Sequence, residues 1–296
     1  MGEIGIHQRF ISCRMFSAIL PDESSPLIMT NVHSSLSSGL MDYTRGWAWQ
    51  QTLLSRRLEL RRTASESESG TDADCVLLLE HSPVYTLGRG ADESHLTFLQ
   101  NDSTGKRQRL ARSNRGVGSA RLLVDRRMES DLLTRPVVEA VDILADSSVP
   151  VMAPNGVPIY RVERGGEVTF HGPGQLVVYP LLDLRRPPYK QDLHWYLRMV
   201  EEVVIQTLLA YDIKGYRDDI NTGVWVGKEK VAAVGVTSSR WITTHGFALN
   251  VSPDLSFFDT SNIIPCGIKG RGVTRIEKIL SEGGSSDIPA IEDVAT

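Results

Sequence analysis

The sequence is poor in cysteine, in long apolar runs and in positive net charge. Its three cysteines, Cys13, Cys75 and Cys266, stand too far apart along 296 residues to indicate a disulfide framework or a cysteine-rich zinc site. The formal net charge of -4 argues against nucleic-acid binding, which usually requires a basic surface. No apolar run approaches the roughly 20 residues that span a bilayer. These absences favour a soluble globular protein in a reducing compartment.

Three stretches lack clear hydrophobic periodicity: two of them bound one expected catalytic domain, residues 39–280, and the third interrupts it. Residues 1–38 carry arginine and serine as an organellar targeting segment does, but their acidic residues fit a disordered terminus nearly as well. We expect a mitochondrial protein, with plastid or cytoplasm as alternatives. Residues 99–150 predict a loop insertion whose basic run, residues 106–115, fits a solvated loop better than a docking surface. Residues 281–296 predict a C-terminal tail.

The remaining sequence predicts more strands than helices. Apolar residues recur at three-to-four spacing after Tyr43 and again within Asp192–Tyr211, which predicts two amphipathic helices that face the core. Short β-prone runs separated by glycine and other turn residues predict strands at Cys75–Glu80, His81–Gly88, Ile159–Val162, Glu167–Phe170, Leu176–Leu182, Gly223–Val226, Lys230–Gly235 and His245–Val251. Strands and helices do not alternate regularly, so we predict a mixed α+β domain and not a doubly wound sheet.

Two residues of this chain are candidates for a nucleophile and a proton-transfer group. Cys266 lies between Pro265 and Gly267, where the backbone must turn and display the thiol, although a lone cysteine is more often a small buried apolar residue. Cys75, which opens an apolar strand, illustrates that alternative. Lys230 precedes an apolar run and would be partly desolvated, which suits proton transfer and thiolate stabilisation, whereas an ordinary solvated lysine is the simpler interpretation.

The segment Arg164–Gln175 is the densest group of glycines and polar side chains. Four glycines and a proline surround Thr169, His171 and Gln175, and glycines let a backbone approach a ligand closely. A turn-rich hairpin is the simpler interpretation, but the polar side chains favour a binding loop. The spacing matches neither a phosphate-binding loop nor a dinucleotide fingerprint, so it does not indicate a nucleotide.

Taken together in order, these motifs resemble the lipoyl(octanoyl) transferases of lipoate biosynthesis. The resemblance runs from about Tyr43 to Ile276, excluding the insertion. It is carried by the strand with Lys230 and by the motifs at Glu80–Gly88, Arg164–Gln175, Tyr179–Pro180, His245–Asn250 and Pro265–Gly267. It implies the mixed α/β fold shared with biotin and lipoate ligases, with mixed sheets flanked by helices.

The resemblance also implies roles for individual residues. Cys266 matches the acyl-accepting cysteine of the family, and Lys230 matches its partner lysine. The acyl pocket is implied at Arg164, Gly165, Gly166, Glu167, Val168, Thr169, Phe170, His171, Ala233, Val234, Gly235, Gly246, Phe247 and Ala248. Backbone amides near Gly172 or Gly267 are candidates for the oxyanion site.

The implied reaction moves an octanoyl group from acyl carrier protein through Cys266 to a lysine of a lipoyl domain. The acceptors would be lipoyl domains of 2-oxoacid dehydrogenase E2 subunits and the glycine cleavage H protein, and the enzyme would act as a monomer. Phosphopantetheine would arrive on the donor, and no ATP or metal would be needed. The alternatives are an ATP-dependent lipoate or biotin protein ligase and a non-catalytic module that binds carrier protein.

Overall fold

A computed structural model of the chain describes residues 7–9, 30–63, 74–100, 120–121, 129–146, 150–267 and 270–295. Its larger sheet contains, in spatial order, β1 (His7–Arg9), β2 (Thr30–Ser34), β3 (Asp74–Leu79), β9 (Gln175–Leu181), β13 (Ile242–Asn250), β12 (Glu229–Ser239), β11 (Val224–Val226) and β10 (Tyr216–Arg217). The smaller sheet contains β5 (Ala120–Arg121), β7 (Pro158–Arg161), β4 (Val84–Leu87) and β8 (Val168–His171), and β6 (Val151–Met152) pairs with β7.

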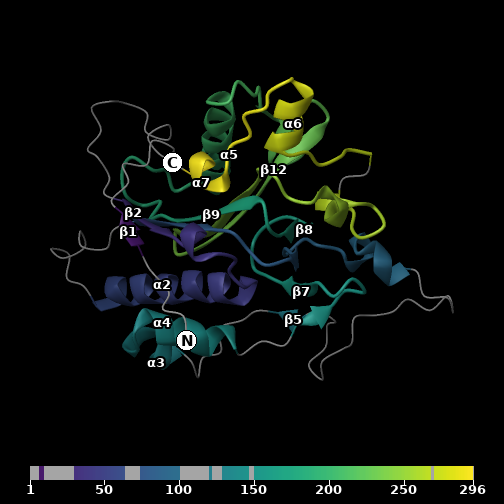
Figure 1. The fold of residues 1–296 in the computed structure, drawn as a ribbon. Helices are drawn as coiled ribbons and strands as arrows, with labels where there is room; N and C mark the ends of the chain where they lie inside the picture. Colours follow the sequence, from purple (N-terminus) through teal and green to yellow (C-terminus); the bar gives the residue numbers. More distant parts are fainter. Residues whose placement is uncertain are drawn as a thin grey trace.

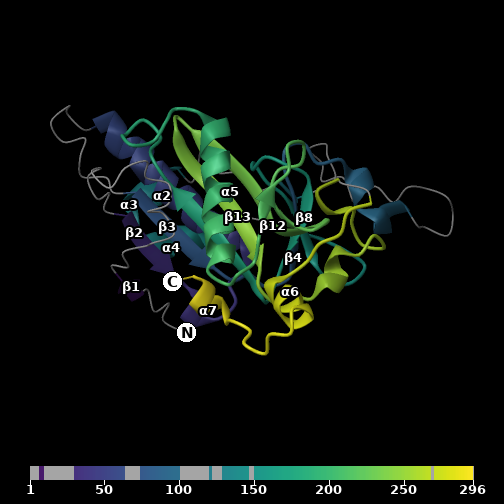
Figure 2. The same cartoon turned by 90° about the horizontal axis from the view of Figure 1, so that it is seen from above.

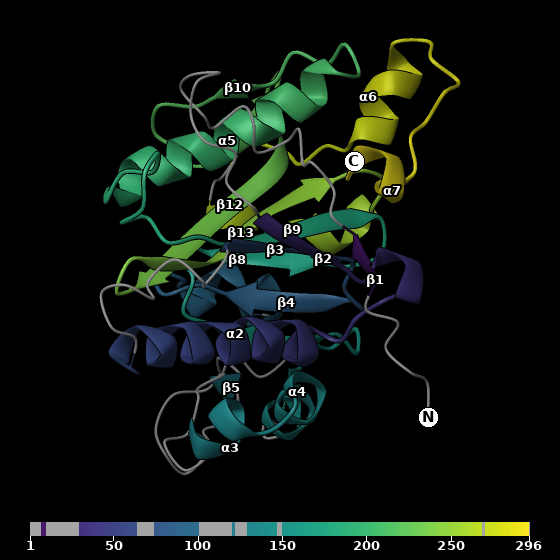
Figure 3. The ribbon, with the colours of Figure 1, turned by 90° about the vertical axis from the view of Figure 1, so that its left-hand side faces the viewer.

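The helices lie on both sides of the larger sheet. Figures 1 and 3 show α5 (Leu193–Leu209), α6 (Ile276–Glu282) and α7 (Ile291–Val294) above it, and α2 (Tyr43–Thr63) below it. Parallel pairs, β2 with β3 and β4 with β7, occur beside antiparallel ones. The predicted mixed α/β class is therefore confirmed. Within the described ranges, every helix is too short or too polar to cross a lipid bilayer.

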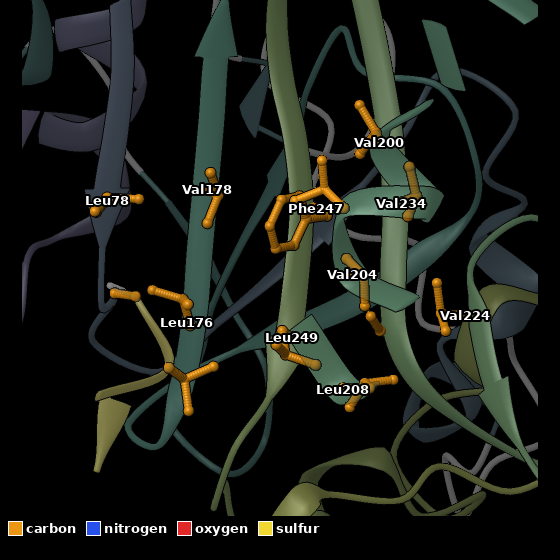
Figure 4. Packing of buried hydrophobic residues seen from close by; sticks show 14 of the residues in the cluster. Leu78, Leu176, Val178, Val200, Val204, Leu208, Val224, Val234, Phe247 and Leu249 are labelled. Carbon is orange, nitrogen blue, oxygen red and sulfur yellow. The ribbon is translucent and has the colours of Figure 1, made fainter. Parts of the chain in front are cut away.

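The central strands are apolar on both faces because each face is covered by a helix. Along β9, Leu176 and Val178 face α5, whereas Val177 and Tyr179 belong to the core on the α2 side, as the two-residue repeat of a strand requires. Figure 4 shows Val200, Val204 and Leu208 of α5 packed over β13 and β12. Figure 2 shows the same helix crossing this sheet, with β4 and β8 of the smaller sheet beyond β12.

Part of the segment predicted as a loop insertion is a structural layer of the fold. Helices α3 (Glu129–Thr134) and α4 (Val137–Ala145) pack beneath α2 (Figure 3), and Leu132 and Leu144 are fully buried against its apolar side. The apolar spacing within residues 137–145 is typical of an amphipathic helix, but the polar residues on both sides of this segment obscured the helical pattern. The basic run at residues 106–115 lies outside the described residues.

The fold also extends beyond both expected boundaries of the catalytic domain. β2 lies before residue 39 and pairs in parallel with β3, so it forms part of the sheet. After residue 280, α7 buries Ile291 and Val294 in the core under α5. Both segments are too short to show strong periodicity in the sequence, and long-range packing stabilises them.

Candidate active site

A cavity of about 230 Å³ lies where β8 and the loop before it face β12 and β13. Its lining comes from both sheets, from α2 and from the loop before β11. The lining residues are Tyr43, Arg164, Gly166, Glu167, Thr169, His171, Val177, Tyr179, Ile220, Asn221, Thr222, Lys230, Ala233, Val234, Gly235, His245, Gly246, Phe247 and Ala248.

All but three of the pocket residues expected from the sequence line this cavity. The exceptions are Gly165, Val168 and Phe170. Along β8, the side chains of Thr169 and His171 reach the cavity, whereas those of Val168 and Phe170 enter the core of the smaller sheet. Successive side chains of a strand point to opposite faces, so a continuous run of lining residues was wrong for this strand.

Glycines allow the loop and the two central strands to approach closely. Gly235 pairs with Gly246 across β12 and β13, and the Gly165 N–H donates to the Val236 carbonyl at 3.1 Å. A Cβ atom on Gly246 would lie 2.2 Å from the Val178 carbonyl oxygen. A side chain there would have to displace a neighbouring strand, so the glycine permits the close packing of β13 on β9 beside the cavity.

We therefore expect Gly246→Ala to destabilise the protein by about 1–3 kcal/mol, the range for overpacking a close-packed interior. Chemical denaturation followed by circular dichroism measures the loss. Gly90→Ala is the control, because a methyl group at Gly90 meets only ordinary contacts, the nearest at 3.5 Å. Equal stabilities of the two variants would show that the strand spacing at Gly246 is not constrained.

Arg164 organises the binding loop. Its side chain is buried and donates hydrogen bonds to the Thr86 carbonyl and hydroxyl, both at 2.8 Å, and to the Glu167 carbonyl at 3.0 Å. It also donates to the Gly165 carbonyl at 2.9 Å. The guanidinium thus holds the loop against β4, and these hydrogen bonds fix the position of Arg164 at the cavity wall.

Lys230 lies at the start of β12 with only 5% of its surface exposed. Its Nζ donates to the Thr222 carbonyl at 2.8 Å and lies 4.8 Å from the centroid of the Trp225 ring. Its backbone N–H donates to the Gly272 carbonyl, and its carbonyl accepts from the Thr274 N–H. The ammonium is therefore fixed at the cavity, and its strand is bonded to the segment that follows Cys266.

Cys266 lies in the short 3-10 helix η6 (Pro265–Gly267), and its side chain lies outside the described part of the chain. The next residue, Gly267, has a φ of 69°, and a Cβ on it would lie 3.2 Å from Cγ of Glu167. Because Glu167 lines the cavity, the backbone beside Cys266 lies at its rim. The Gly267 N–H donates to the Ile264 carbonyl at 3.0 Å, so this amide is occupied and is not a free oxyanion donor.

Comparisons with known proteins identify the family. A sequence model of the lipoyl protein ligase A/B catalytic domain matches residues 145–294. An octanoyltransferase of Gloeobacter violaceus is 40% identical over 79% of this chain and 75% of its own length. The chloroplastic octanoyltransferase of Arabidopsis thaliana is 37% identical over 82% of this chain and 66% of its own length. The chain belongs to the octanoyltransferase family.

The family resemblance drawn from the motifs is thus confirmed, and with it the prediction of an acyltransferase enzyme. The structure of a lipoate protein ligase from T. acidophilum with bound lipoic acid shares the fold, with a TM-score of 0.50 at 12% identity over 90% of this chain and 80% of that one. Among the described residues, no group of three or more His, Cys, Asp or Glu side chains is arranged to hold a metal ion.

The sequence interpretation missed several residues that line the candidate site of this octanoyltransferase. Tyr43 was expected only as a core residue of its helix, and nothing in the sequence pointed to Ile220, Asn221 or Thr222. The other missed lining residues are Val177, Tyr179 and His245. Two of these, Tyr179 and His245, lie within motifs that carried the family resemblance, which was the available signal.

Three buried aromatic residues, His81, His171 and Tyr179, form a layer beside the cavity. Nδ1 of His81 lies 2.9 Å from the Met41 carbonyl oxygen and Nε2 lies 3.0 Å from the Tyr179 hydroxyl. The carbonyl can only accept, so Nδ1 donates and the tyrosine donates to Nε2. Burial lowers the pKa of His81 to about 4, and burial likewise lowers the pKa of His171 well below its ordinary value. Both rings are therefore neutral at pH 7.

Because its histidines are neutral in the native protein, we expect the protein to lose stability in mild acid. Between pH 6.5, the ordinary pKa of His81, and pH 4, the unfolded chain binds a proton at His81 that the native protein does not bind. Stability therefore falls as the pH falls through this window, by up to about 3 kcal/mol for His81 alone. Urea titrations at pH 7, 6, 5 and 4.5 measure this slope, which should be shallower in His81→Gln. Parallel profiles for the two proteins would contradict the assignment.

Proposed function

We propose that this octanoyltransferase takes its acyl group from octanoyl-acyl carrier protein, holds it as a thioester on Cys266, and transfers it to a lysine of a lipoyl domain. One observation supports this most directly. The buried ammonium of Lys230 lines a cavity whose rim is formed beside the Cys266 turn, and the strand of Lys230 is hydrogen-bonded to the segment after Cys266.

The two steps follow from the chemistry of thioesters. The Cys266 thiolate attacks the octanoyl carbonyl, and the pantetheine thiolate leaves and takes a proton from Lys230. Splitting the transfer in this way replaces one difficult step by two easier ones. The acceptor amine then attacks the acyl-enzyme, and the neutral Lys230 amine takes a proton from it. The donor is already activated, so we propose that neither ATP nor a metal takes part.

The apolar part of the cavity suits a fatty acyl chain. Val177 of β9, Ala233 of β12 and Ala248 of β13 supply apolar side chains to its wall, whereas Val234 and Phe247 border the cavity but pack their side chains in the core under α5. Burial of a methylene contributes about 0.8 kcal/mol, so an octanoyl chain has much to gain from such a wall. This supports an acyl group of medium length as the occupant.

The test is to incubate the protein with octanoyl-acyl carrier protein, without ATP and with a chelator, and to measure the intact mass. We expect an adduct of one octanoyl group that hydroxylamine removes, and none on Cys266→Ala. Cys75→Ala is the matched control, because Cys75 is a buried residue of β3 and its loss should leave the adduct in place. An adduct that persists on Cys266→Ala would overturn the proposal.

The same assay separates this proposal from the ligase alternative. A ligase of related fold would modify a lipoyl domain only when free octanoate and ATP are supplied. The fold resemblance to a lipoate protein ligase makes the measurement with free octanoate and ATP necessary. Transfer from the carrier protein without ATP, together with none from free octanoate with ATP, would exclude it.

We propose lipoyl domains of 2-oxoacid dehydrogenase E2 subunits and the glycine cleavage H protein as acceptors, and a plastid as the compartment. The chloroplastic name of the Arabidopsis relative and the cyanobacterial source of others support the plastid over the mitochondrion expected above. A fluorescent fusion of the full chain, imaged against plastid and mitochondrial markers, tests the compartment.

A further inference from the structure

His95 and Glu167 form a hydrogen-bonded pair beside the Cys266 turn. His95 ends the short 3-10 helix η2 (Glu93–His95), and its Nδ1 lies 3.1 Å from Oε2 of Glu167, which lines the cavity. The same Oε2 accepts the Asp92 N–H at 3.2 Å. The carboxylate thus fixes both the backbone that carries His95 and the orientation of the ring.

This arrangement determines which ring nitrogen of His95 can act as a base. An ionised carboxylate only accepts hydrogen bonds, so Nδ1 of the neutral ring carries the proton and Nε2 keeps its lone pair. Within the described residues, Nε2 has no hydrogen-bond partner. The side chain is 22% exposed, so a proton on Nε2 has a path to water. A carboxylate that orients an imidazole in this way is a recurrent arrangement for general bases.

The pair lies against the backbone next to Cys266. A Cβ on Gly267 would lie 2.9 Å from Cε1 of His95, the ring carbon between the two nitrogens. The Ile264 N–H donates to the His95 carbonyl at 2.8 Å, which attaches the Cys266 turn to this helix. Consecutive Cα atoms are about 3.8 Å apart, so the imidazole lies within a side chain's reach of a group carried by Cys266.

The second step of the proposed reaction releases more protons than one lysine can take. A lysine side chain has an ordinary pKa of about 10.4, so the acceptor arrives as an ammonium. When its nitrogen bonds to the acyl carbon and the carbon–sulfur bond breaks, the products are an amide, the Cys266 thiolate and two protons. The neutral Lys230 amine accepts one of them and recovers the proton that it gave to pantetheine. The other proton needs a second base.

We propose that Nε2 of His95, oriented by Glu167, accepts this second proton from the attacking amine and passes it to water. The inference rests on the proposed thioester mechanism and adds a base that serves only its second step. Lys230 then serves both steps, whereas His95 serves the transfer to lysine alone.

The test measures the two steps separately on the full chain with His95→Gln. Loading from octanoyl-acyl carrier protein, followed by intact mass without acceptor, should proceed at the wild-type rate. Discharge of the loaded enzyme to a lipoyl domain should slow by about 10²–10⁴-fold, the usual contribution of a general base. Discharge to hydroxylamine should stay near the wild-type rate, because this neutral nucleophile releases one proton, which Lys230 accepts.

Two further variants control the experiment. His194→Gln removes an exposed histidine at the start of α5 and should leave all three rates unchanged. Glu167→Gln should slow discharge to lysine by a smaller factor, and the double variant should be no slower than His95→Gln alone, because Glu167 acts through His95.

The possible failures are distinguishable. Discharge of His95→Gln to lysine at the wild-type rate would overturn the role of His95 and leave the thioester mechanism intact. Equal slowing of loading and of both discharges would also overturn it, since His95 would then only support the Cys266 turn. If wild-type protein forms no adduct at all, it is the proposed mechanism that fails.

Discussion

Substitution of Lys230 by methionine is expected to slow the loading of the protein from octanoyl-acyl carrier protein by roughly 10³-fold, within the range for loss of a general acid–base group. Methionine has a similar length and is apolar, so it can occupy the buried position against Trp225. What is lost is the proton on Nζ that stabilises the thiolate and protonates the leaving pantetheine. Rapid-quench intact mass measures the loading rate.

Two other substitutions show whether the effect depends on proton transfer. Lys230→Arg keeps the positive charge but cannot give up a proton, so its turnover should remain low even if Cys266 still loads. Lys228→Met is the matched control, because Lys228 is exposed and lies two residues away on the same hairpin. Loading of Lys230→Met at the rate of Lys228→Met would remove Lys230 from the mechanism.

The parts of the fold predicted best from the sequence are those in which local pattern and final environment agree. The helix predicted within Asp192–Tyr211 is α5, and its N-terminus is capped by Asp192, whose carboxylate accepts the His194 N–H at 2.8 Å. The strand predicted at Cys75–Glu80 is β3, buried along its whole length. Periodicity, caps and apolar runs are local signals, so they are visible without the rest of the chain.

The parts predicted poorly depend on contacts between distant segments. Leu144 of α4 is buried only because α2 covers it, and Ile220 reaches the cavity only because its loop lies beside β12. Successive side chains of β8 point to opposite faces, so Thr169 faces the cavity and Phe170 faces the core. A motif match treats the whole segment as one unit and does not separate the two faces. Motifs therefore indicated which segments form the site, whereas the structure was needed to show which side chains reach the cavity.

Asp74 is a further case, because a run of mostly polar residues precedes it in the sequence and the structure buries it. Its Oδ1 accepts hydrogen bonds from Nη2 of Arg57 at 2.9 Å, from Nη2 of Arg186 at 2.7 Å and from the Asp183 N–H at 2.9 Å. Arg57 is itself buried, with 5% of its side chain exposed. This carboxylate joins α2, β3 and the chain after β9 at one point.

Asp74→Ala should therefore lower the free energy of unfolding by about 3–5 kcal/mol, because it removes the carboxylate that compensates the buried charge of Arg57. For a protein of this size the midpoint of thermal unfolding should fall by roughly 10 °C. Differential scanning calorimetry measures both quantities. The control is Asp131→Ala, which removes an exposed ion pair with Arg135 and should cost less than about 1 kcal/mol.

A double variant distinguishes the uncompensated charge from the loss of packing. Asp74→Ala/Arg57→Met removes both charges of this buried pair, so the double variant should be more stable than Asp74→Ala alone, although it contains one more substitution. A lower stability of the double variant would show that Arg57 stabilises the fold through its bond to the Leu181 carbonyl, 2.5 Å away, more than it destabilises the fold as a charge that Asp74 no longer compensates.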